Sequence, residues 1–197
     1  MQKPKQKRSI ERIKKILDAS NDLLNESGIE SLTIAKISEF AELKRTSTYK
    51  FFETPDEIKQ ALIKRYVQDC NQHLNKTIAL NSEGDYSLCL RECVVSIIEF
   101  FQSNKGAQKL ILENTVSPPV ESSDLHEIAE TILKHIEKSV GLPNMFNKSG
   151  VFLVVTQIII SILSLNTKEN SGLTDVGLNE AVRAANAYLL SCIATPA

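Results

Sequence analysis

The chain has 197 residues, a length that fits one medium-sized domain or a small domain followed by a body of ~150 residues. Hydrophobic residues make up 42% and charged residues 24%, the balance of a soluble protein with a real core. Only 7 Gly and 6 Pro occur, which argues against a protein of many strands and turns. We therefore expect an all-α fold of helices joined by short loops.

The net charge of −1 conceals an asymmetry along the chain. Residues 1–65 carry 14 Lys and Arg against 10 Asp and Glu, whereas residues 66–197 carry 9 against 14. The excess of positive charge is greatest in residues 1–15, which contain one acidic residue and seven basic ones: Lys3, Lys5, Lys7, Arg8, Arg12, Lys14 and Lys15. A basic end on an acidic body suggests contact with a polyanion, although a solvated, disordered tail has the same composition.

Several compartments and site classes are disfavoured. The four cysteines match no metal-finger spacing; Cys89 and Cys93 would share a helix face, as a thiol switch, half a metal site or, more commonly, small buried hydrophobes. The charged start lacks the apolar segment of a secretory signal. The most apolar run, residues 151–165, is interrupted by polar residues and shorter than the ~20 residues of a membrane span. We expect a reduced, cytoplasmic protein that uses no membrane, metal or cofactor.

The predicted elements begin with a helix over residues 9–27, which repeats apolar positions at helical spacing. Ser9 is its expected N-cap and Gly28 its C-terminal stop. Thr33 then caps a short second helix. After a brief turn, the polar and basic residues 44–49 form a third short helix.

A long helix follows and leads into the rest of the chain. Thr54, Pro55 and Glu57 form a capping box with proline at the first helical position. If the helix continues to about residue 78, it spans ~36 Å at 1.5 Å per residue. Further helices are expected near 86–102, 107–116, 122–139, 149–166 and 178–194, about nine in total.

Three short helices within residues 9–52 have the size of a helix-turn-helix that binds double-stranded DNA. The third has the character of a recognition helix: Lys44 and Arg45 can reach guanine or phosphate, and neighbouring hydroxyls can reach base edges. Thr33 places a hydroxyl and backbone N–H groups where a phosphate could lie. The predicted DNA-binding residues are Thr33, Lys36, Lys44, Arg45, Thr46, Ser47, Thr48, Tyr49 and Lys50.

The same region resembles a known family. The order and spacing of Ile16-Leu17-Asp18-Ala19, Leu23-Leu24, Gly28, Leu32-Thr33, Ile37, Ala41 and Thr48-Tyr49-Lys50-Phe51-Phe52 are similar to the N-terminal signature of the TetR family of bacterial transcriptional regulators. The resemblance covers about residues 10–66. It implies a homodimer, usually a repressor, that binds a roughly palindromic operator and is released by a small ligand in the C-terminal body.

Three positions depart from that family pattern. Glu42 stands where relatives often have Gly in the turn, which is strained if φ must be positive and brings a negative charge near DNA. Pro55 replaces a common phosphate-contacting Lys, and Ala35 replaces a common Arg. These departures motivate an alternative, in which the chain keeps the fold as a ligand- or partner-binding module but has lost specific DNA binding.

The division expected is a tail and DNA-binding head at 1–54 and an effector-binding, dimerising body at 55–197. The helices near 149–166 and 178–194 are apolar or rich in small residues, which suits a four-helix interface between two copies or a monomeric core. A pocket for an unknown small molecule is expected in the body. Its candidate lining residues are Tyr66, Cys70, His73, Tyr86, Cys89, Gln108, Asn114 and Gln157.

An enzyme is disfavoured, and no catalytic residue is predicted. There is no Gly-rich phosphate loop, nucleophile elbow or paired metal motif. His126 begins a sequence similar to a zinc-protease helix, but the second histidine is missing, and His135 falls on the opposite helix face. A small helical enzyme remains as a rival without a residue set to support it.

Overall fold

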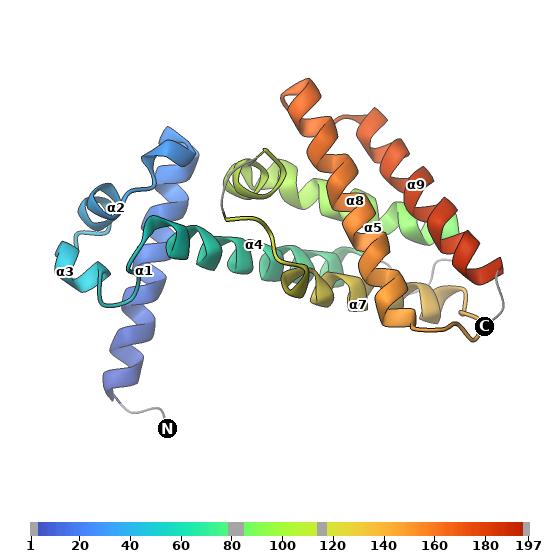
Figure 1. Ribbon diagram of the computed structural model, residues 1–197, viewed down its shortest axis with the longest axis horizontal. Coiled ribbons are helices and arrows are strands. Elements are labelled where there is room, and N and C mark those ends of the chain that lie inside the picture. The colour runs from blue at the N-terminus through green and yellow to red at the C-terminus, as the bar shows by residue number, and fades with distance from the viewer. Residues whose placement is uncertain (1–3, 79–84, 114–117, 195–197) are drawn as a thin grey trace.

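The computed structural model describes residues 4–78, 85–113 and 118–194, and over these residues the chain is helical, with no strand. The all-α prediction is confirmed. The described helices are α1 (Pro4–Ser27), α2 (Ile34–Phe40), α3 (Arg45–Thr48), α4 (Pro55–Thr77), α5 (Tyr86–Ser103), α6 (Lys105–Ala107), α7 (Ser122–Ser139), α8 (Lys148–Asn170) and α9 (Asp175–Ala194). Helices α1 to α3 gather at one end, and α4 runs from them into the remaining helices (Figure 1).

The first helix is longer than the sequence suggested. It begins at Pro4, so Ser9 lies inside it and is not its N-cap. Proline is favoured in the first turn, and the Lys, Gln and Arg residues that follow are good helix formers, so nothing stops the helix before Ser9. At the other end the prediction is confirmed: Gly28 follows the helix with φ of +79°, a conformation that glycine adopts without strain.

The predicted start of α4 at Thr54 is confirmed, but the Glu57 side chain bonds to the residue before the cap rather than to the cap itself. The Thr54 hydroxyl accepts a hydrogen bond from the Glu57 backbone N–H at 3.2 Å, and the Glu57 carboxylate accepts one from the Glu53 N–H at 2.7 Å. Pro55 occupies the first turn. Side chains at every fourth position are buried along one side of the helix: Ile58, Leu62, Tyr66, Cys70 and Leu74. Helix α4 is thereby fixed on one face along its whole length.

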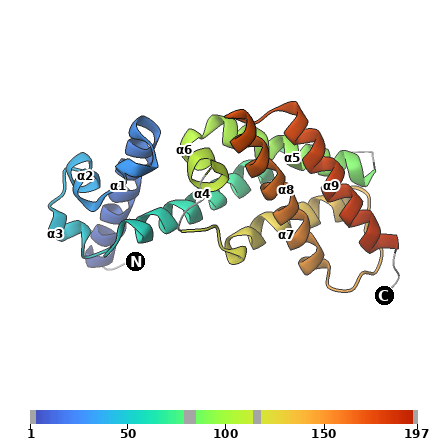
Figure 2. The ribbon, with the colours of Figure 1, turned by 45° about the horizontal axis from the view of Figure 1, so that its top comes forward.

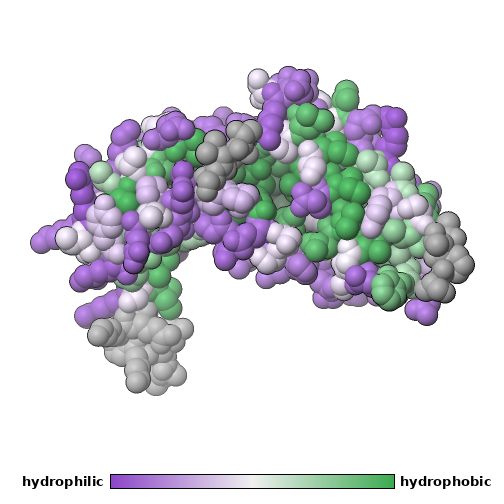
Figure 3. Space-filling view, in the orientation of Figure 1, coloured by the Kyte–Doolittle hydropathy of each residue, from purple (hydrophilic) through white to green (hydrophobic). Residues whose placement is uncertain are grey.

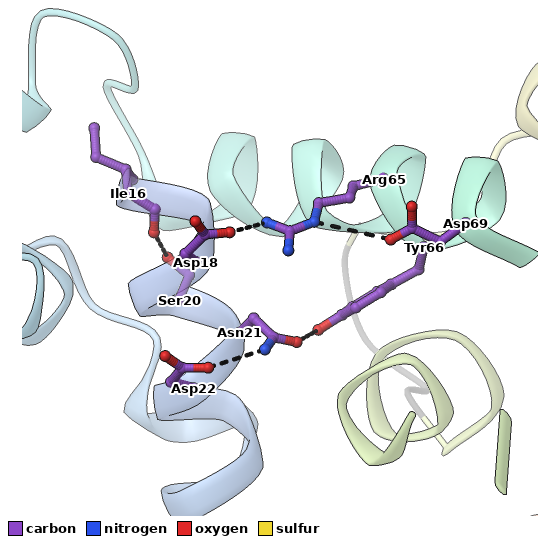
Figure 4. Close-up of polar contacts among 8 residues, drawn as sticks. All are labelled: Ile16, Asp18, Ser20, Asn21, Asp22, Arg65, Tyr66 and Asp69. Atoms are coloured by element: carbon purple, nitrogen blue, oxygen red, sulfur yellow. Dashed lines mark hydrogen bonds and ion pairs between the residues drawn. The ribbon is translucent and has the colours of Figure 1, made fainter. Parts of the chain in front are cut away.

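Polar contacts join α1 to α4 (Figure 4). Arg65 donates to the Asp18 carboxylate at 2.6 Å, and the Tyr66 hydroxyl donates to the Asn21 side-chain oxygen at 2.6 Å. Burial raises the pKa of Tyr66 to about 12, so its hydroxyl keeps its proton and remains a donor across the physiological range. These contacts set the direction in which α4 leaves the head.

A second contact joins α1 to the segment after α5. The Lys109 ammonium lies 3.3 Å from the backbone oxygens of Leu24 and Asn25, in the last turn of α1. Gly106 lies so close that an added Cβ would be 2.5 Å from the Tyr66 hydroxyl oxygen. A glycine is therefore required for this approach.

The helix expected over 107–116 differs from the prediction. Helix α6 ends at Ala107, and Gln108–Glu113 forms a wider π-helical turn. The Ser164 hydroxyl of α8 donates to the Leu112 carbonyl oxygen of this turn at 2.6 Å, so a side chain from elsewhere in the fold satisfies part of its backbone. A tertiary contact of this kind has no signature in the local sequence.

Helix α8 has 23 residues and extends past the predicted 149–166 at its C-terminal end. Among the described residues it is the helix whose length and composition could cross a membrane. It packs as a core helix does. Phe152, Val155, Ile159 and Leu163 lie one turn apart and are fully buried against the neighbouring helices α7 and α9. The expectation of a helix covered by protein is confirmed for this face.

Candidate nucleic-acid interface

The third helix presents its basic residues to solvent. Lys44, at the N-cap of α3, is exposed, as are Arg45, Thr46 and Lys50, while Ser47 is half-buried. Tyr49 is 53% exposed, which is unusual for a ring this large and leaves it available to a partner. Helix α3 therefore offers hydrogen-bond donors of the kind that contact base edges and phosphates.

One member of the predicted set has a different place. Thr48 is fully buried, and its hydroxyl is hydrogen-bonded to the Ser38 hydroxyl of α2 at 2.8 Å. Ser38 also lies 2.6 Å from the Ile34 backbone oxygen. Thr48 cannot reach DNA, so its inclusion among the contact residues was wrong; it instead holds α3 against α2.

The start of α2 lies at the surface of the head. Thr33 is exposed and caps the helix, accepting a hydrogen bond from the Lys36 N–H at 3.3 Å. The Lys36 side chain is exposed as well, and Ala35 between them is half-buried. The cap predicted for Thr33 is confirmed, whereas its contact with a phosphate stays a prediction.

The turn between α2 and α3 contains the strain that the sequence indicated. Glu42 has φ of +51°, in the left-handed region that disfavours side chains other than glycine. Its side chain is 86% exposed and lies 3.5 Å from the Lys15 ammonium of α1. The turn thus carries an exposed carboxylate at positive φ, with a neighbouring cation that offsets its charge.

The exposed first half of α1 adds positive charge to the head. Lys7, Arg8, Arg12 and Lys14 are exposed, as is Lys15. Lys3, the first residue of the predicted basic tail, lies outside the described residues. The basic tail is largely helical rather than extended, because its residues are good helix formers.

None of the clefts described between α4 and α7 contains a predicted pocket residue from the described part of the chain. Tyr66, Cys70 and Cys89 are at most 3% exposed and belong to the packed core. Gln157 lies on the outer face of α8 and donates to the Ser161 hydroxyl. Their grouping into a pocket stays a prediction, since periodicity identifies residues that face inward but does not separate core residues from ligand contacts.

The other candidates are dispersed as well. The ring of His73 is 6.2 Å from that of Phe100, and Gln108 donates to the Glu113 carboxylate within its own turn. Tyr86 is half-buried at the start of α5, and Asn114 lies outside the described residues.

A cleft that the sequence did not indicate lies between α4 and α7, toward the end of α4 remote from the head. It encloses about 440 Å³ and is lined by Asn75, Lys76, Ile78, Thr131, Lys134, His135 and Lys138. The lining comes from two helices more than 50 residues apart in the chain, so only their packing brings it together.

The chain is similar to known proteins over part of its sequence and in its fold. No protein-family model matches the chain. Over 102 residues, which are 51% of its length, the chain is 24% identical to the nucleoid occlusion factor SlmA of Haemophilus ducreyi, and it spans about half the length of that protein.

Solved structures match over nearly the whole chain. A TetR-family transcriptional regulator from Streptomyces coelicolor has a TM-score of 0.68 at 20% identity, over 92% of this chain and 99% of its own. The multidrug binding protein EbrR complexed with imidazole has a TM-score of 0.64 at 18% identity, over 94% and 97%. SmeT, the repressor of the Stenotrophomonas maltophilia multidrug efflux pump SmeDEF, has a TM-score of 0.57 at 16% identity, over 91% and 89%. At these identities the likeness concerns the fold.

Proposed function

We propose that this chain, which has the fold of TetR-family transcriptional regulators, is a cytoplasmic DNA-binding regulator, most simply a repressor, and not an enzyme. In this proposal residues 1–54 bind a roughly palindromic operator, and residues 55–197 pair two copies and bind a small ligand that releases the DNA. One observation supports the proposal most directly. The hydrogen-bond donors of Lys44, Arg45 and Thr46, at the start of α3, are exposed, while Thr48 of the same helix is fixed by a buried hydrogen bond with Ser38.

The contact surface is the exposed side of α2 and α3, together with the N-terminal half of α1. Base contacts come from the start of α3, because that end of a recognition helix enters the major groove. Phosphate contacts come from the surrounding groups. The proposed contact residues are Thr33, Lys36, Lys44, Arg45, Thr46, Ser47, Tyr49 and Lys50.

Pairing is assigned to the outer face of α8 and α9. Val154 is 41% and Leu165 61% exposed on α8, with Ile158 and Ile162 half-buried between them at helical spacing. Figure 3 shows hydrophobic side chains gathered over this part of the molecule. A two-fold interface here would cover them and double the number of DNA contacts.

The DNA test is a titration with fragments flanking the chain's own gene, in excess nonspecific competitor at two salt concentrations. The wild type is expected to bind one fragment specifically, two protomers per site, and less tightly at the higher salt. Arg45→Ala should weaken binding at least tenfold, since a base contact is worth ~1–3 kcal/mol and is lost in both heads. Lys168→Ala, which removes an exposed cation from α8, should not.

The pairing test is the mass of the protein in solution by analytical ultracentrifugation. Leu165→Glu should shift the dimer toward monomer, because it places a charge in an apolar interface. Leu88→Glu makes the same change at a residue 42% exposed on α5 and serves as the matched control. A wild-type monomer at micromolar concentration would contradict the assignment.

A second function is favoured by Glu42 alone. An exposed carboxylate in the turn next to α3 opposes approach to phosphates. If no flanking or genome-selected fragment binds specifically, the chain is a ligand- or partner-binding module that keeps the fold.

A further inference from the structure

We propose that the cleft between α4 and α7 is a binding site for a small organic anion, held by Lys76, Lys134 and Lys138. The cleft volume, about 440 Å³, is within the range of small-molecule sites. A neighbouring hollow of about 460 Å³ shares Asn75, Thr131 and Lys134 with it, so the two form one groove along the seam of the helices. Figures 1 and 2 both show α4 and α7 side by side.

The charge of the groove is unevenly distributed. Among the described residues, the cleft is lined by three lysines and by no carboxylate, whereas the neighbouring hollow includes Glu127 and Glu130. Within the part of the chain that the structure describes, Lys134 lies 3.8 Å from Glu130, and no ion pair of Lys76 or Lys138 is present. Because the Lys134–Glu130 pair is exposed and long, it is weak, and Lys134 can turn to a ligand.

The lysines also offset helix dipoles, since Lys76 and Lys138 occupy the last turns of α4 and α7. That role explains one cation at each helix end. It does not explain Lys134, which lies one turn earlier in α7 and faces the same cleft. Three like charges lining one cleft repel each other, and an anion between them relieves that repulsion.

The floor of the groove is polar and largely ordered by its own hydrogen bonds. The Asn75 amide donates to the Thr131 hydroxyl at 3.2 Å, and that hydroxyl donates to the Asn71 side-chain oxygen at 2.8 Å. This ladder fixes the spacing of α4 and α7 and leaves polar atoms along the groove. A ligand with a hydroxyl or carbonyl group beside its anionic group matches such a floor.

A second feature of the cleft is His135, one of whose ring nitrogens is buried without a hydrogen-bond partner among the described residues. Its side chain is 1% exposed, and its Nε2 lies 3.0 Å from a Glu92 carboxylate oxygen. Its Nδ1 is buried and has no hydrogen-bond partner among the described residues. A buried polar atom without a partner is destabilising by about 1–3 kcal/mol. Because His135 is among the residues that line the cleft, a hydroxyl group on the ligand could supply the missing partner.

The position of the cleft links a bound anion to both the DNA-binding head and the proposed pairing face. Helix α4 carries the DNA-binding head at its other end, and α7 packs on α8 of the proposed pairing face. An anion that bridges Lys76 of α4 and Lys134 of α7 would fix these two helices relative to one another. This regulatory role rests on the proposed function, whereas binding itself does not.

Binding is tested by thermal unfolding of the full chain with 10 mM citrate or inorganic phosphate, against sodium chloride of equal ionic strength. With a Kd near 1 mM, the midpoint of the wild type should rise by about 3–5 °C. In Lys76→Gln/Lys138→Gln the rise should disappear, and in Lys105→Gln/Lys168→Gln, an equal charge change on exposed residues outside the cleft, it should remain. An equal rise in all three proteins, or no rise in the wild type with either anion, overturns the site.

Regulation is tested by repeating the DNA titration with the anion present. A change in DNA affinity of about fivefold or more in the wild type, absent from Lys76→Gln/Lys138→Gln, supports regulation through this site. An unchanged affinity overturns the regulatory role while the unfolding result still decides the site. If the chain binds no DNA at all, the proposed function fails, and the unfolding result is again unaffected.

Discussion

The turn residue Glu42 allows strain and charge to be separated by experiment. Replacing it with glycine removes the penalty of a positive φ, about 1–2 kcal/mol for a non-glycine residue. Against this, glycine loses more backbone entropy on folding, about 0.5–1 kcal/mol. The contact with Lys15, between two exposed side chains, contributes between zero and about 1 kcal/mol and is lost. The free energy of unfolding should therefore change by between a loss of about 1 and a gain of about 1.5 kcal/mol.

DNA affinity should respond more clearly than stability. If the turn faces DNA, a carboxylate ~10 Å from a phosphate raises the free energy of the complex by about 0.4 kcal/mol in water. Removing it from both heads of a dimer should increase affinity about fourfold at low salt, and the released Lys15 adds to the gain. Because a further cation then meets phosphate, the dependence of affinity on salt should also become steeper.

The assay is fluorescence anisotropy with the operator fragment at several salt concentrations, together with urea unfolding. Glu42→Gln is the decisive companion, because it removes the charge but keeps a side chain at positive φ. It should match Glu42→Gly in DNA affinity but not in stability. Glu169→Gln, an equal charge change in α8, should leave affinity unchanged. A Glu42→Gln variant that binds DNA no more tightly than the wild type would show that the turn does not face DNA.

Three further outcomes follow from the packing. Thr48→Val removes the buried hydrogen bond with Ser38 and should lower the free energy of unfolding by about 1–2 kcal/mol in urea titrations; an unchanged value would contradict a structural role. Gly177→Ala places a Cβ against the side chain of Asn166 and should lower the thermal midpoint, whereas Gly172→Ala, where an added Cβ meets open space, is the control. At pH 8 no more than one thiol per native chain, that of Cys192, should react with a disulfide reagent, because Cys70, Cys89 and Cys93 are buried; burial also raises the pKa of Cys70 to about 12 and raises that of Cys93. Rapid reaction of several thiols would refute this.

The accuracy of the sequence-based predictions follows from the range of the interactions involved. The caps at Thr33 and Thr54 and the positive φ at Glu42 depend on a few adjacent residues, and each was identified from the sequence. The start of α1 was misplaced because a possible cap, Ser9, was given more weight than helix-forming neighbours.

The errors at the site arise from long-range packing. Thr48 was assigned to DNA because its neighbours are exposed, but a helix of one turn has an inner face, and Ser38 of α2 lies against it. The cleft was missed because Lys76 and Lys134 come from helices whose register is set by the Asn75–Thr131 contact. No pattern within either helix encodes that register.

The bonds between α1 and the rest of the chain allow an estimate of the free energy that could couple ligand binding to DNA binding. A rotation of α4 against α1 must disturb the bonds of Arg65 with Asp18 and of Tyr66 with Asn21, and a shift of the π-helical turn must move Lys109. Each such bond is worth about 0.5–1.5 kcal/mol net. The free energies that couple two sites in regulated proteins are typically about 1–3 kcal/mol. Breaking two of these bonds would therefore change the free energy by an amount of the size that couples two sites.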